Sequence, residues 1–329
     1  MDCRVNLMKK KSVRLVLVGM CGAAGLLVTP AMRAESGLSV SAVTMSANEA
    51  ETGHPLEGFW KKTWIRKKGD SHKGSQPFVH YKYYGEDHIT EIAECFRQYW
   101  QHALKYGEHE DDHAGEQFAN HVARMLISQF MKDKSQRAED LLWACDDKTL
   151  EGQVEWYKKL CAKGKESYEQ LLCCYEKLDA RLIDHERILF EDSLYLQAEI
   201  YYNCYSGALL MCEALCEAFA GEYKLAFYKA GKARKAYLRA DRDMRDREHG
   251  KWHDFYANEC LTDIKQTAWV IEGLMSYIRN LGDGPHFYLW QREFLYSEED
   301  RRVVLVCNME NHLKDLELYE LMEERYGDM

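Results

Sequence analysis

Residues Leu194–Phe219, LYLQAEIYYNCYSGALLMCEALCEAF, place apolar side chains at steps that alternate between four and three. The residues on this stripe are Leu194, Ala198, Tyr201, Tyr205, Ala208, Cys212, Leu215 and Phe219. Side chains at this spacing share one face of an α-helix. The stripe extends over about 26 residues, or roughly 40 Å of helix. It predicts a long helix that buries one face along its whole length.

Two further helices are expected after this one, and Gly221 is placed to end the first. Small residues dominate the stripe of the second: Ala226, Ala230, Ala233, Tyr237, Ala240 and Met244. Alanine on a contact stripe lets two helix axes approach closely, so we expect the first two helices to pair antiparallel across Gly221. The third carries Leu261, Ile264, Ala268, Ile271, Met275 and Ile278. The sequence GDGP at 282–285 then ends it.

The rest of the chain after about residue 87 is also mainly helical in pattern. Helices are expected at about 88–106, 113–132, 136–145, 149–182 and 310–326, with short extended pieces at Phe287–Trp290 and Val303–Val306. Strands and helices do not alternate, so the pattern excludes a (β/α)₈ barrel. The predicted fold class is mainly α, an antiparallel bundle of long helices with a small N-terminal β-hairpin.

The first residues have the features of an export signal. Lys9–Lys11 and Arg14 form a basic start, and Leu15–Val28 is an apolar run too short to span a bilayer. Cleavage is expected after Ala31 or Ala34. The expected organisation is a signal peptide at 1–34, a linker at 35–56, a small β-hairpin region at 57–86 and an α-helical domain at 87–329. We therefore expect export to the periplasm or the extracellular space.

Charge and hydropathy exclude two classes of partner, and the positions of the cysteines indicate the state of their thiols. The net charge of −10 makes nucleic acid an unsuitable partner, because phosphates would be repelled. No stretch after the signal is apolar enough to form a membrane helix, so no membrane span is expected in the mature chain. Five cysteines lie within helical patterns and are interpreted as small buried residues with free thiols: Cys173, Cys174, Cys204, Cys212 and Cys216.

The segment Glu248–Leu295 gathers aromatic residues at high density. One interpretation is a sugar-binding site, in which a pyranose ring stacks on an aromatic side chain and its hydroxyls form hydrogen bonds with nearby polar groups. The candidate residues for this site are Trp252, Asp254, Tyr256, Asn258 and Trp290. The alternative is that these aromatic rings pack the joints between helices, with their polar tips in water.

Other motifs give no catalytic or metal-binding candidate. His109–His113 spells H-E-x-x-H, the zinc protease pattern. Gly107 and Glu108 precede it and two aspartates lie inside it, so an acidic turn at the surface is the better interpretation. Carboxylate pairs such as Glu298-Glu299 lack the rigid setting that an acid and a nucleophile require. No catalytic residue, metal or cofactor is expected.

Three segments resemble the helical region of glycoside hydrolase family 115, the xylan α-glucuronidases. They are FEDSLYLQAEIYYNCYSGALLMCEAL (190–215), EHGKWHDFYANECLTDIKQTAW (248–269) and LGDGPHFYLWQREFL (281–295). Gly250-Lys251-Trp252 matches the aromatic-rich segment that follows a long helix pair in the family. The resemblance covers roughly 135–327 and implies a link to xylan, from which the family removes glucuronic acid. The family's catalytic residues belong to a barrel that this chain lacks.

Three functions follow as expectations. The first is an exported accessory or carbohydrate-binding module, whose partners would be a plant polysaccharide or oligosaccharide and a glycoside hydrolase. The second is a helical scaffold or interaction protein without a carbohydrate role. The third is a glycosidase with an unrecognised site. Exposure of the aromatic rings near Asp254 favours the first, and their full burial favours the second.

Overall fold

The computed structural model describes residues 88–102, 115–257, 263–298 and 312–327. Within these ranges all regular structure is helical, which confirms the predicted α-helical bundle. The predicted signal peptide, linker and β-hairpin region at 57–86 lie outside the described residues. The chain forms two compact units, one of Met1–Ala103 with Gln170–Ala198 and one of Leu104–Glu169 with Glu199–Met329. Among the described helices, none is long and apolar enough to cross a membrane.

The first unit is built around the end of helix α8 (Leu150–Asp179), from Gln170 onward. It also contains α6 (Ile89–His102), α9 (Asp184–Phe190) and the π-helical turn η3 (Glu191–Tyr195). The buried Tyr175 hydroxyl donates a hydrogen bond of 3.1 Å to the carbonyl of Cys95. The Tyr175 ring also meets Phe190 edge to face at 5.5 Å between centroids. Tyr175 therefore joins three helices of this unit.

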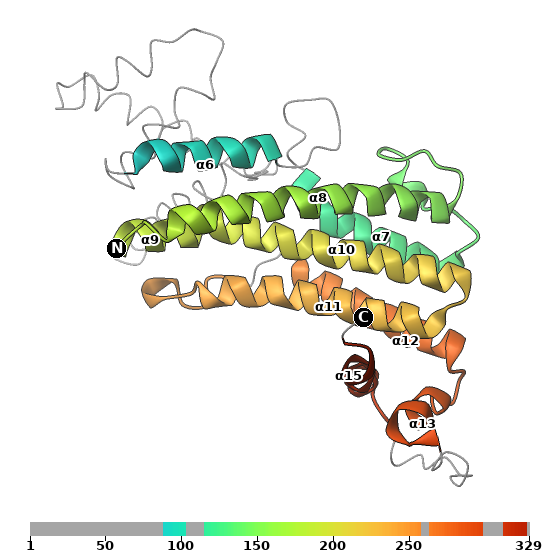
Figure 1. The fold of residues 1–329 in the computed structure, drawn as a ribbon. Coiled ribbons are helices and arrows are strands. Elements are labelled where there is room, and N and C mark those ends of the chain that lie inside the picture. The colour runs from blue at the N-terminus through green and yellow to red at the C-terminus, as the bar shows by residue number, and fades with distance from the viewer. Residues whose placement is uncertain (1–87, 103–114, 258–262, 299–311, 328–329) are drawn as a thin grey trace, which may run out of the picture. The chain divides into compact units, whose positions relative to one another are not determined.

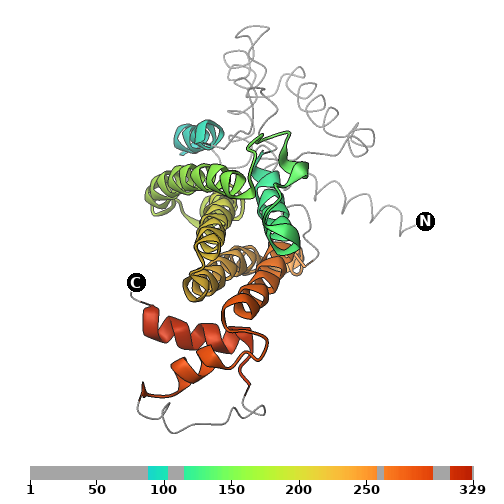
Figure 2. The ribbon, with the colours of Figure 1, turned by 90° about the vertical axis from the view of Figure 1, so that its right-hand side faces the viewer.

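The second unit is a bundle of long helices (Figures 1 and 2). It comprises α7 (Gly115–Asp133), α8 up to Glu169, α10 (Leu196–Ala220) from Glu199, α11 (Tyr223–Asp246) and α12 (Ile264–Gly282). Short 3₁₀ turns η2 (Glu139–Leu141) and η4 (Gly250–Trp252) lie between them. Helices α13 (Leu289–Leu295) and α15 (Asp315–Tyr326) follow α12 and pack against each other.

Helix α10 buries the face that its stripe predicts. Seven of the eight predicted stripe residues are buried, and Phe219 is half-buried. Of the buried seven, Leu194 lies in η3, and Leu194 and Ala198 belong to the first unit. Phe219 still contacts the core, because its ring meets Phe130 of α7 edge to face at 5.2 Å. The six predicted stripe residues of α11 are all buried. Both α10 and α11 therefore bury the face that the steps of three and four define.

The predicted antiparallel pairing of α10 with α11 is confirmed. Asn203 donates a hydrogen bond of 2.7 Å to Asp243 near one end of the pair, and Lys229 meets Glu217 at 2.7 Å near the other. Gly207 allows the close approach, since an added Cβ would lie 2.8 Å from the Tyr237 ring. Gly221 makes the turn with φ of 85°, a conformation that suits glycine.

Two local predictions are wrong. Within 136–145 the only regular structure is the short 3₁₀ turn η2, and no α-helix forms. The Gln153 side-chain amide bonds both backbone groups of Ala138, at 2.7 and 3.0 Å, and so fixes the backbone just before this turn. Phe287–Trp290 is not extended. Phe287 adopts φ of 51°, and the Asp283 carboxylate accepts a hydrogen bond from the Trp290 amide within the first turn of α13. In both places a distant polar side chain fixes the backbone, which periodicity does not reveal.

The cysteine prediction is confirmed in part. Cys204 and Cys212 are buried and Cys216 is half-buried, and all three are free thiols. Cys173 and Cys174 are exposed, so their predicted burial is wrong. The buried stripe of α8 passes through Tyr168, Leu171 and Tyr175, which leaves the two intervening cysteines on the outer face.

Leu215→Ala is expected to lower the free energy of unfolding by about 2–5 kcal/mol, because a fully buried leucine leaves a cavity when it is truncated. The matched control is Leu225→Ala on α11, whose side chain is 40% exposed and whose loss should cost at most about 0.5 kcal/mol. Urea denaturation followed by circular dichroism measures both. Equal midpoints for the two variants would contradict the burial of the α10 stripe.

Candidate functional site

The candidate site is the loop Glu248–Ala257, here called the aromatic loop, which follows the end of α11 in the second unit. It begins with η4 and continues as a series of turns. Gly250 and Asp254 both have positive φ, 51° and 58°. Glycine adopts this conformation without cost, whereas Asp254 is one of the few other residue types that tolerate it. The backbone therefore bends sharply twice within five residues.

The Glu248 carboxylate closes the aromatic loop. One of its oxygens accepts a hydrogen bond of 3.0 Å from the Asp254 amide, and the other accepts one of 2.7 Å from the Tyr256 amide. Hydrogen bonds from backbone N–H groups to a charged carboxylate are among the stronger ones in proteins. The loop is therefore held in one conformation by a residue at its start.

Three aromatic rings of the loop contact one another edge to face. Trp252 meets Phe255 at 5.6 Å and Phe255 meets Tyr256 at 4.9 Å between centroids, with interplanar angles of 84° and 85°. All three side chains are half-buried. The Lys251 ammonium lies 5.0 Å from the centre of the Trp252 ring. The loop thus presents partly accessible aromatic surface beside a cation. This half-burial is intermediate between the two alternatives drawn from the sequence, which are exposed rings that bind a sugar and buried rings that pack between helices.

The exposed side chains of His253 and Asp254 meet at the tip of the loop. Their side chains are 77% and 68% exposed, and Nδ1 of His253 lies 2.8 Å from Oδ2 of Asp254. A pair this open to water contributes little to stability. It does place a carboxylate and an imidazole within reach of a polar ligand at the loop.

The structure brings together only some of the predicted site residues. Trp252, Asp254 and Tyr256 lie on the aromatic loop, and Asn258 lies outside the described residues. Trp290 is 4% exposed and packs edge to face on Phe227, at 5.8 Å, near the start of α11. The aromatic loop follows the other end of α11, so about 30 Å of helix separates the two places. Trp290 belongs to a second cluster, which the sequence had not distinguished from the first.

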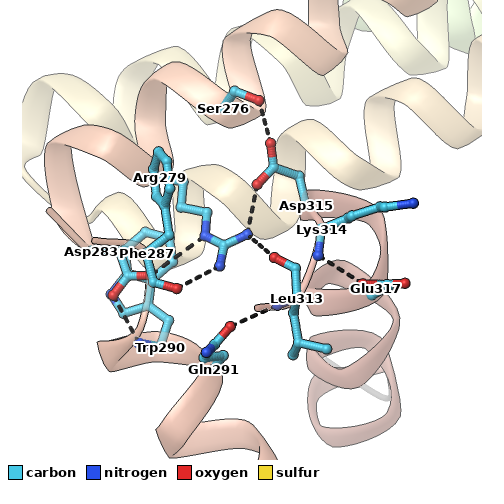
Figure 3. A network of polar contacts seen from close by, with 10 residues as sticks. All are labelled: Ser276, Arg279, Asp283, Phe287, Trp290, Gln291, Leu313, Lys314, Asp315 and Glu317. Atoms are coloured by element: carbon cyan, nitrogen blue, oxygen red, sulfur yellow. Dashed lines mark hydrogen bonds and ion pairs between the residues drawn. The ribbon is translucent and has the colours of Figure 1, made fainter. Parts of the chain in front are cut away.

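That second cluster surrounds the buried Arg279 of α12 (Figure 3). Its guanidinium donates to Asp283 at 3.4 Å, to Asp315 at 2.8 Å and to the carbonyls of Leu313 and Phe287 at 2.9 and 2.8 Å. Asp283 also accepts from the Trp290 amide at 2.9 Å. All three nitrogens of the Arg279 guanidinium thus donate hydrogen bonds, and these bonds connect α12 to the segments just before α13 and α15. These contacts make Arg279 a structural residue.

Two of the described cysteines, Cys95 and Cys216, are not activated as nucleophiles. Burial, with Cys174 and Glu91 nearby, raises the pKa of Cys95 to about 12. Burial and a hydrogen bond to Glu155 raise the pKa of Cys216 to about 11. A thiolate is the reactive form, so neither group is prepared for nucleophilic chemistry at neutral pH. In the part of the chain that the structure describes, no group of three or more His, Cys, Asp or Glu side chains could hold a metal ion. The His109–His113 motif lies outside that part.

No protein family model, curated protein or solved structure matches this chain. The fold and the aromatic loop define its class: a helical bundle protein whose described residues include a fixed, partly exposed aromatic loop after the long helix α11.

Proposed function

We propose that this protein is an exported, non-catalytic carbohydrate-binding or accessory protein that recognises an acidic polysaccharide through its aromatic loop. The observation that carries the proposal is the fixed Trp252–Tyr256 cluster, closed by two hydrogen bonds to Glu248. A sugar ring stacks on a preformed aromatic surface at less entropic cost than on a mobile one. Half-burial of the three side chains leaves part of their surface accessible for such a contact.

The charge beside the aromatic rings supports an acidic sugar. The Lys251 ammonium lies next to Trp252, where it would meet the carboxylate of a glucuronic acid branch. Exposed Asp254 would accept hydrogen bonds from sugar hydroxyls. The sequence resemblance to glycoside hydrolase family 115 points to the same ligand, glucuronoxylan, and to a hydrolase as partner.

Trp252→Ala is expected to weaken binding of glucuronoxylan oligosaccharides about tenfold, or 1.4 kcal/mol, because the ring supplies the stacking surface. Isothermal titration calorimetry on the purified protein measures the affinity, and the same samples are assayed for released glucuronic acid. The matched control is Trp269→Ala, which removes a 67% exposed tryptophan on α12, outside the aromatic loop, and should leave the affinity unchanged.

Three outcomes would count against the proposal. Equal affinities for wild type and a folded Trp252→Ala variant would remove the loop from the binding site. An absence of heat for every acidic oligosaccharide would favour a scaffold role. Release of glucuronic acid would show hydrolysis and replace the accessory role with an enzymatic one.

Trp269 supports the second candidate function, a helical interaction protein. It lies on the outer face of α12, opposite the buried stripe, and Gly273 one turn later leaves open space beside it. Exposed tryptophan is enriched among residues that dominate protein interfaces. The Trp269→Ala variant separates the two functions, because it should reduce partner binding and leave sugar binding intact.

A further inference from the structure

Cys161 and Cys212 face each other across α8 and α10 within the second unit. Tyr168 lies seven residues after Cys161 on α8, and Tyr205 lies seven residues before Cys212 on α10. The rings of these tyrosines stack with centroids 5.7 Å apart. On the other side of the two cysteines, Glu155 of α8 accepts a hydrogen bond of 3.2 Å from Cys216 of α10. The Tyr168 ring also packs on Tyr201 at 5.7 Å, so these contacts place the two cysteines within about one turn of each other along the antiparallel helices.

The two thiols are in contact in the core between α8 and α10. Cys161 and Cys212 hydrogen-bond to each other, and both are fully buried. On one side the next turn of each helix carries a small buried residue, Gly164 on α8 and Ala208 on α10, and on the other side it carries the buried Tyr157 and Leu215. Small side chains let helix axes approach closely. Close approach is what a disulfide needs, because it joins Cα atoms that lie about 4.4–6.8 Å apart.

We propose that Cys161 and Cys212 form an interhelical disulfide when the chain folds in the presence of a disulfide oxidant such as oxidised glutathione. One cysteine thiolate attacks a sulfur of the oxidant and releases one molecule of reduced thiol. The second thiolate attacks the resulting mixed disulfide and releases the other. Two protein thiols lose two protons and two electrons, and the oxidant is reduced to two thiols.

The bond forms during folding and not afterwards. In the folded chain both sulfurs are closed off from solvent, and burial raises the pKa of Cys212 well above its ordinary value. Cys216 is more accessible, but it is held as a thiol beside Glu155. A folded, reduced chain therefore offers the oxidant no reactive thiolate at this place.

The experiment refolds the full chain from denaturant, either with a reductant or with a glutathione redox buffer, then alkylates free thiols and digests with trypsin. The expected product is peptide 160–163, LCAK, linked to peptide 188–224 and lighter than the two reduced peptides by two hydrogen atoms. Fragmentation locates the bond at Cys212, since the larger peptide also contains Cys204 and Cys216. The oxidised protein is expected to melt about 5–10 °C higher.

Variants decide whether the pair is specific. Cys216→Ala should keep both the linked peptide and the rise in melting temperature, whereas Cys161→Ala and Cys212→Ala should each lose both. The same redox buffer added to already folded, reduced protein should give the link at least about tenfold more slowly, because burial withholds both thiols. A link at Cys204 or Cys216, or refolding to full helicity in the redox buffer without the LCAK link, would overturn the proposal.

Discussion

Arg279→Ala is expected to lower the free energy of unfolding by about 3–5 kcal/mol, because it leaves a buried carboxylate without its cation. The side chains of Arg279 and Asp283 are 1% and 0% exposed, so water cannot replace the lost partner. The carbonyls of Leu313 and Phe287 would lose their donors in the same step. Guanidinium denaturation followed by circular dichroism measures the change.

The matched control is Arg234→Ala. Arg234 pairs with Glu272 at 3.0 Å, but the side chains are 20% and 41% exposed. An ion pair of this kind contributes about 0–1 kcal/mol. The contrast between the two arginines isolates the effect of burial on one chemical group. If both variants lose the same small amount, the Arg279 cluster behaves like a surface ion pair.

Arg279→Lys tests the geometry of the network. Lysine keeps the charge but not the planar fork, so it cannot reach Asp283, Asp315 and two carbonyls together. The free energy of unfolding of Arg279→Lys should therefore lie between that of the wild type and that of Arg279→Ala. Hydrogen exchange should increase in α13 and α15, whose starting segments the guanidinium holds, and should change little in α11.

The long helices could be predicted because their stabilising signal repeats. The stripes of α10 and α11 give many concordant positions each, so a single exception such as the half-buried Phe219 does not alter the result. The aromatic loop is different. Its shape depends on one carboxylate, Glu248, that bonds amides six and eight residues later. No periodic pattern announces such a bond.

The sequence does contain one usable sign of the Arg279 cluster. Arg279 directly follows Ile278 and lies one turn after Met275, so it falls on the buried face of α12, with Asp283 one turn further. A charge on an apolar face with an opposite charge at i+4 indicates a buried ion pair. The contacts to Leu313 and Asp315 come from more than thirty residues away and require the folded structure.

Trp290→Ala is expected to lower the free energy of unfolding by about 3–5 kcal/mol, because it empties the space that the ring fills between α11, α12 and α13. The ring packs on Phe227 at 5.8 Å between centroids and lies over Gly282, where an added Cβ would meet it at 2.4 Å. Trp269→Ala is again the control, since an exposed tryptophan should cost no more than about 0.5 kcal/mol. Urea denaturation midpoints give both values.

The same variant decides which role Trp290 has. About 30 Å of α11 separates it from the aromatic loop, so Trp290→Ala should leave the affinity of the folded fraction for acidic oligosaccharides unchanged. Trp252→Ala should show the reverse, with weaker binding and nearly unchanged stability. If Trp290→Ala kept its stability and lost binding, the sugar site would have to be moved to the Arg279 end of the bundle, and the half-buried rings after α11 would be packing residues only.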